Sequence, residues 1–169
     1  MVSTYISAVN QKLLFARQLL QMVESAGITS VSSHQAAAVT QSVVVQLHQA
    51  WLWHCRNVAE SYKLKEVELV TDGDSLVALL AQQNKCPGEA TELQQLQNEP
   101  GSWLSELLNA HRHIYLLPVV RKAEMDVDRL PMIALDAPEA MDWRIEQAQV
   151  WLQNLRELID RQRDMMIEF

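Results

Sequence analysis

The stretch from residue 33 to 63 constrains the fold of this chain more than any other part of the sequence. From Ser25 to Cys55 there is no Asp, Glu, Lys or Arg. A stripe with steps of three and four residues runs along it through Val44, His48, Trp51, Cys55, Val58 and Tyr62. This spacing is typical of one buried face of a helix. We therefore predict a single helix about 45 Å long, with Trp51 in the middle of its buried face.

The uncharged run is not predicted to cross a membrane. Residues 36–55 have a suitable length, but the run is amphipathic and contains Thr40, Gln41, Ser42, Gln46, His48, Gln49 and His54. The first residues also lack the basic segment followed by an apolar segment that marks a signal peptide. The two cysteines, Cys55 and Cys86, are too few for a disulfide scaffold. We predict a cytoplasmic protein with no membrane contact.

The net charge of −7 and the pI near 5.2 argue against a nucleic-acid surface, which needs a basic stripe. The charge is also uneven. Residues 1–62 hold three basic and two acidic residues, and the remainder holds eleven basic and nineteen acidic residues. The front of the chain therefore presents faces of Gln, Asn, Ser and Thr. Such faces lose water more easily than charged ones, so they favour either broad burial or a protein interface.

Further helices follow from period and capping signals. A strict heptad predicts a helix over residues 3–25 through Ile6, Val9, Leu13, Ala16, Leu20 and Val23. Phe15, Leu19 and Met22 form a second stripe, which predicts contact with two or more neighbours. Short helices are predicted at 75–83 and 89–98, and longer ones at 102–113 and from the Asp136–Glu139 capping signal to about Met165. Residues 116–136 are a long connection, whose centre, 121–129, we expect to be mobile.

These elements predict one all-α domain over residues 1–169. The architecture that we expect is an up-down-up-down four-helix bundle, with a short helical insertion between the second and third long helices.

The segment at Tyr5 and Asn10–Ala16 resembles an uncharacterised proteobacterial family of small helical proteins, of the type found in Pseudomonas. These open with a similar Tyr…Asn-Gln-Lys-Leu-x-Phe-Ala segment. The likeness continues at His48, at Cys55 and in the pattern Trp103–Leu108. The chain departs from the family in its uncharged second helix. The resemblance implies no activity, so it supplies no catalytic residue.

His48 and His111 are the candidate metal ligands, because both fall on apolar faces of helices and facing bundle helices can build a site. The Glu-x-x-His signature of di-iron bundles is absent, since Glu106 precedes His111 by five residues. The alternative is a core histidine held by a hydrogen bond. We favour this reading: His48 is then neutral and bonded to Asn10, Gln11 or His111. A nucleophilic Cys55 paired with His54 or His48 is disfavoured in an apolar helix.

We therefore predict a protein with no catalytic residue, cofactor or metal, which acts through protein–protein contacts and forms a homodimer. Trp53, Gln46 and Gln49 lie off the main stripe of the second helix and are the predicted interface. Asn10 and His48 are the predicted buried polar residues. Asn10 either fixes helix register or lines a small-ligand pocket. The alternative function is a metal-dependent bundle enzyme with its site near His48 and His111.

Overall fold

The computed structural model describes residues 4–27, 31–117 and 141–167, and within these ranges it contains helices and no strands. The long helices are α1 (Thr4–Ala26), α2 (Ser33–Ser61) and α6 (Ile145–Ile167). The short ones are the 3-10 helix η2 (Val67–Leu69), α3 (Gly73–Gln82), α4 (Gly88–Asn98) and α5 (Trp103–Ile114). The predicted all-α class is confirmed.

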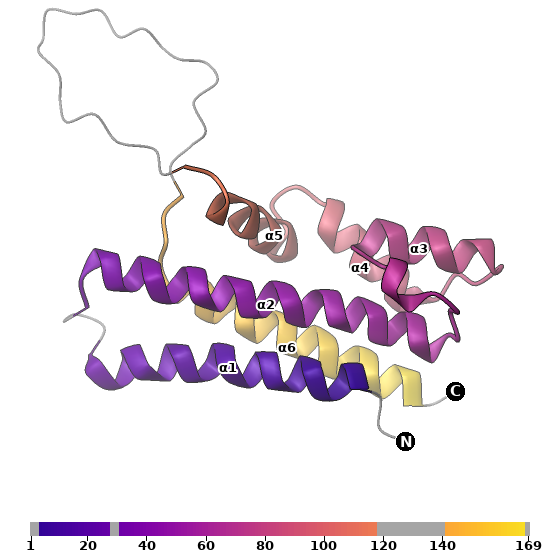
Figure 1. Ribbon diagram of the computed structural model, residues 1–169, viewed down its shortest axis with the longest axis horizontal. Coiled ribbons are helices and arrows are strands. Elements are labelled where there is room, and N and C mark those ends of the chain that lie inside the picture. Colours follow the sequence, from indigo (N-terminus) through magenta and orange to yellow (C-terminus); the bar gives the residue numbers. More distant parts are fainter. Residues whose placement is uncertain (1–3, 28–30, 118–140, 168–169) are drawn as a thin grey trace, which may run out of the picture.

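Helix α2 is the central element of the fold. It contacts α1, α3, α4, α5 and α6. In Figure 1 the axes of the three long helices lie side by side along the length of the molecule. Helices α3, α4 and α5 lie on the side of α2 away from α1. Helix α5, the predicted third helix of the bundle, has only twelve residues. The specific up-down-up-down four-helix arrangement is therefore not confirmed, because short helices form the second layer.

The ends of the helices follow their capping signals. The Ser32 side chain accepts a hydrogen bond from the Gln35 backbone N–H, and the Gln35 side chain accepts one from the Ser32 backbone, so that a capping box starts α2. Asp72 caps α3 in the same way, through the Ser75 backbone N–H. Gly27 ends α1 with a φ of 82°, a backbone region that favours glycine.

The start of the last helix differs from the prediction. Residues 136–140, which carry the capping signal, lie outside the described residues, and Met141–Arg144 is not helical. Met141 and Trp143 are half-buried, whereas Asp142 and Arg144 are exposed. This alternation has the period of an extended chain, and the helix begins only at Ile145. The predicted mobile segment 121–129 also lies outside the described residues.

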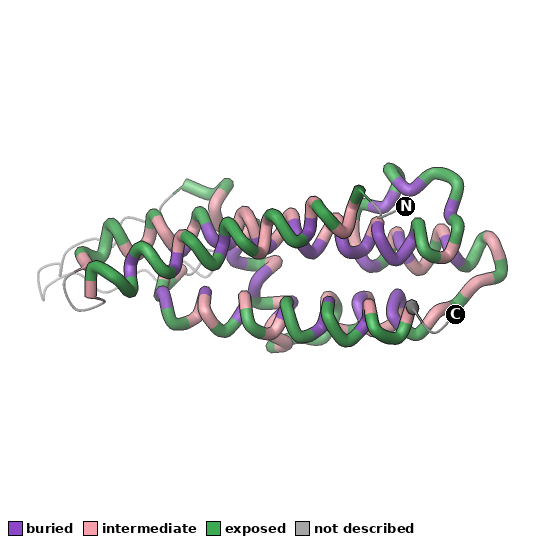
Figure 2. The backbone as a smooth tube through the Cα atoms, turned by 90° about the horizontal axis from the view of Figure 1, so that it is seen from below, coloured by how far each residue is buried: buried purple, intermediate pink, exposed green. Residues whose placement is uncertain are grey.

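The core is built from the predicted stripes. Trp51 is 2% exposed, and the heptad residues Val9, Ala16, Leu20 and Val23 of α1 are buried. Figure 2 shows the buried positions of the long helices facing each other and the exposed positions facing outward. Among the helices of the described part, none combines the length and apolar character needed to span a membrane.

Candidate functional site

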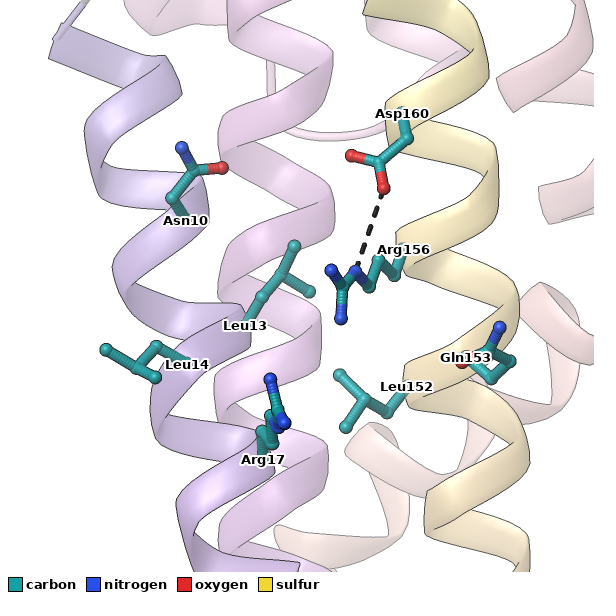
Figure 3. Close-up of a pocket in the computed structure, with 8 residues that line it drawn as sticks. All are labelled: Asn10, Leu13, Leu14, Arg17, Leu152, Gln153, Arg156 and Asp160. Carbon is teal, nitrogen blue, oxygen red and sulfur yellow. Dashed lines mark ion pairs between the residues drawn. The ribbon is translucent and has the colours of Figure 1, made fainter.

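A groove of about 500 Å³ runs between α1 and α6. It is lined from α1 by Asn10, Leu13, Leu14 and Arg17, and from α6 by Leu152, Gln153, Arg156 and Asp160. In Figure 3, Leu13 and Leu152 extend from opposite sides toward the space between the helices, with the Arg17 and Arg156 side chains beside them. The four residues from α1 have the i, i+3, i+4, i+7 spacing of one helical stripe, so a single helix face forms this wall.

Two side-chain bridges fix the register of α1 against α6. Arg163 Nη1 donates to Asn10 Oδ1 at 2.7 Å, and Gln149 Nε2 donates to Glu24 Oε1 at 2.7 Å. Both bridges fit one antiparallel register, in which Leu13 lies level with Asp160. A second hollow, lined in part by Leu20, Gln21 and Leu152, continues the groove toward the Gln149 bridge. The bridges are fourteen residues apart on α1, so the groove is about 21 Å long.

The groove carries an incomplete set of charge pairs. Arg156 Nε lies 3.7 Å from Asp160 Oδ2, and both side chains are more than half exposed. Arg17 is exposed and forms no ion pair within the described ranges. The groove therefore offers one free guanidinium and a carboxylate that can accept a second partner.

Beside this groove, the exposed residues of α1 from Gln11 to Met22 are apolar or carboxamide residues, apart from Arg17. Leu14 is 50% exposed, Phe15 39% and Met22 70%. Gln11, Gln18 and Gln21 of the same helix are also exposed. Phe15 and Met22 belong to the second stripe of α1. The predicted contact of α1 with two or more neighbours is confirmed, because α1 contacts α2 and α6, but these two side chains are exposed in the described part of the chain. Exposed apolar side chains that group together on one protein surface are candidates for an interaction surface.

The predicted interface residues of α2 are half-buried. Lys12 Nζ lies 5.4 Å from the centre of the Trp53 ring and 5.7 Å from that of Phe15, so α1 partly covers Trp53. The side-chain oxygens of Gln46 and Gln49 are buried without a hydrogen-bond partner among the described residues. The large exposed apolar residues of the α1–α2 hairpin are therefore on α1 and not, as predicted, around Trp53 of α2.

The structure brings His48 and His111 together as a stacked pair. Their ring centroids are 3.6 Å apart and their planes differ by 2°. Burial, together with the nearby His111, lowers the pKa of His48 to about 4, and burial also lowers the pKa of His111. Both rings are therefore neutral near pH 7. The pair borders a hollow of about 330 Å³ that Asp72 and Arg112 also line.

Two predictions about buried polar residues need correction. His48 is only half-buried, and within the described ranges its ring packs on His111 and Trp51 instead of forming a hydrogen bond. Asn10 is exposed rather than buried, because it lies at the edge of α1 that faces the groove and binds Arg163.

The stacked geometry is poorly suited to a metal. The lone pair of an imidazole nitrogen lies in the plane of its ring, and two parallel planes 3.6 Å apart cannot both contain one ion. Across the described ranges, no three His, Cys, Asp or Glu side chains are grouped so that they could hold a metal ion. A catalytic zinc site commonly uses three protein ligands. Metal binding here would require the rings to rotate and a further ligand to approach.

A buried polar network, which sequence reasoning missed, links α2, α4 and α6. His54 and Gln162 are fully buried, with His54 Nε2 2.8 Å from Gln162 Oε1. Gln162 Nε2 donates to Glu92 Oε2 at 2.8 Å and to the Glu89 carbonyl at 3.3 Å. Arg161 donates to both carboxylate oxygens of Glu92. Because the Gln162 amide nitrogen serves both acceptors, its oxygen accepts from His54, which carries its proton on Nε2.

The neighbouring Cys55 has no access to this network or to solvent. It is a free, buried thiol, and burial raises its pKa. A protonated and enclosed thiol is a poor nucleophile, which agrees with the interpretation of Cys55 as a small core residue.

The chain was compared with family models, curated proteins and solved structures. The model of a family described as "Family of unknown function (DUF6586)" matches residues 1–169. No curated protein and no solved structure matches the chain.

Proposed function

We propose that the chain, which belongs to this family of unknown function, acts through protein–protein contact and associates with itself. The observation that carries the proposal is the outer face of α1 beside the groove between α1 and α6, where apolar and carboxamide side chains are exposed. Laying an apolar helix face into a groove is a common mode of protein recognition. The groove is about as long as four turns of helix.

The residue types on this exposed face of α1 are typical of a binding surface rather than of a catalytic site. Its exposed side chains between Gln11 and Met22 are apolar or carboxamide groups, apart from Arg17, which also lines the groove. Carboxamides form hydrogen bonds without the large desolvation cost of charges. In keeping with this role we propose a cytoplasmic protein of proteobacterial origin that needs no cofactor and contacts neither nucleic acid nor membrane.

Sedimentation equilibrium tests self-association directly. We expect a dimer at micromolar concentrations, and a shift to monomer when Leu14→Glu or Met22→Glu places a charge on the α1 face. Leu69→Glu is the matched control, because Leu69 is 53% exposed but lies on η2, away from this face. A clean wild-type monomer at high micromolar concentration would contradict the proposal.

A metal-dependent enzyme is the second candidate, and the contact between His48 and His111 is the observation that favours it. The expected result under our main proposal is that added Zn²⁺ leaves the melting temperature unchanged. A rise in wild type that disappears in both His48→Leu and His111→Leu would instead support a metal site. His113→Leu is the control, because His113 bonds to the carbonyl of Asn109 in its own helix.

A further inference from the structure

We infer that the occupant of the groove is a second copy of this chain, with α1 of each copy lying antiparallel in the α1–α6 groove of the other. The inference rests on the proposed self-association and adds its geometry. In such a pair α1 is both the ligand and one wall of the receptor, as a two-fold interface requires. The exposed Leu14 and Phe15 lie close to the two-fold axis.

The charges of the groove select this register. In one copy, Asp160 lies level with Leu13, four residues from Arg17 along the axis of α1. If two antiparallel α1 helices cross at the level of Phe15, Arg17 of the second copy comes level with Leu13 of the first. The unpaired Arg17 therefore meets Asp160 of the other copy, and symmetry makes this pair twice.

The pairing of Arg17 with Asp160 is also compatible with Arg156. The Asp160 carboxylate already lies 3.7 Å from Arg156 Nε, so in the dimer it would lie between the guanidinium of Arg156 and that of Arg17 from the other copy. A single carboxylate can accept hydrogen bonds from more than one donor. In an interface with an apolar centre and two symmetric ion pairs at its sides, the ion pairs fix the relative orientation of the two copies. They contribute less to the affinity.

A helix of this chain suits the groove in composition as well as charge. The α1 face between Gln11 and Gln18 supplies Leu14 and Phe15 as apolar side chains and carries no acidic residue that would compete for Arg17. Apart from Arg17 itself, its remaining exposed groups are the carboxamides of Gln11 and Gln18, which can bond to Gln153 and Asn10 of the facing copy.

Charge reversal tests the register. Arg17→Glu and Asp160→Arg should each raise the dissociation constant of the dimer about tenfold or more, since each variant sets two like-charge pairs in place of two attractive ones. The double variant restores opposite charges and should return the constant to within about threefold of wild type. Lys65→Glu makes the same change in net charge at an exposed site outside the groove and should have no effect. All four variants change exposed side chains, so unchanged melting temperatures check the fold.

Disulfide trapping gives a second, independent measurement. In a Cys86→Ser background, Leu14→Cys should form an intermolecular disulfide on treatment with oxidised glutathione, because the two copies of residue 14 lie about 3 Å apart along the axis. Met22→Cys is the matched control, since its copies would lie about 21 Å apart along the axis. Cys55 is buried and does not compete.

The outcomes separate the two proposals. A wild-type monomer overturns both self-association and its geometry. A dimer that is indifferent to Arg17→Glu and Asp160→Arg, or that cross-links through Met22→Cys rather than Leu14→Cys, overturns the α1-in-groove geometry alone and leaves self-association standing.

Discussion

Replacing Trp51 with Ala should lower the free energy of unfolding by about 3–5 kcal/mol. Trp51 is 2% exposed and belongs to the central helix, so its removal leaves a large cavity that the surrounding helices can fill only in part. Its ring also packs 5.5 Å from that of His48, and this contact is lost. The indole Nε1 has no hydrogen-bond partner among the described residues, so Ala strands no buried polar group.

Urea unfolding at pH 7 measures this loss, with Trp53→Ala as the matched control. Trp53 lies on the same helix but is half-buried under Lys12, so the identical substitution should cost clearly less. Equal effects at the two positions would mean that the buried side of α2 has been assigned to the wrong residues. An unchanged midpoint in Trp51→Ala would lead to the same conclusion.

The helices could be predicted because their signals are local. The heptad from Ile6 to Val23 and the stripe through Trp51 depend only on spacing along one chain. The caps at Ser32 and Asp72 depend on residues three positions apart. Such signals determine where a helix begins and which side of it is apolar.

The sequence does not predict in the same way which helix packs against each apolar side. Phe15 and Met22 form an apolar stripe as regular as a core stripe, yet they are exposed, because spacing does not reveal whether another helix is present. Likewise His48 lies on the expected side of α2 but at its edge, where it stacks on His111, one of its three expected partners, instead of forming a hydrogen bond to α1. Which helices come together is set by the connections between them and by how their sides pack, and neither follows from the spacing of residues along one helix.

One feature of the sequence indicates the buried network of His54, Gln162 and Glu92. Gln162 continues the apolar stripe of α6 three residues after Ile159, so a polar group occupies a core position. Such a group needs partners, because an unpaired buried amide costs about 1–3 kcal/mol. The sequence does not identify those partners, since His54 and Glu92 lie on other helices.

Acidification from pH 6.5 to pH 4 should destabilise the fold, with His54 contributing about 3 kcal/mol to the loss. Burial, together with the positive charge of Arg163, outweighs the hydrogen bond to Gln162 and lowers the pKa of His54 from 6.5 to about 4. Above pH 6.5 His54 is neutral in both the folded and the unfolded chain, so it does not make the free energy of unfolding depend on pH. Between the two pKa values the unfolded chain binds a proton that the folded chain does not, so stability falls as the pH falls.

The test compares slopes of stability against pH rather than absolute stabilities. His54→Gln keeps a side-chain amide that can donate to Gln162 but does not titrate, so urea unfolding between pH 7 and pH 4.5 should show a markedly flatter dependence than in wild type. His48→Gln should flatten it less, because His48 is half-exposed and solvent screens its charge. If His54→Gln retains the wild-type slope, then the folded protein accepts a proton at His54 near its ordinary pKa. The enclosed bond between His54 and Gln162 would then be open to water, and helices α2 and α6, which it links, would be less tightly closed than this packing requires.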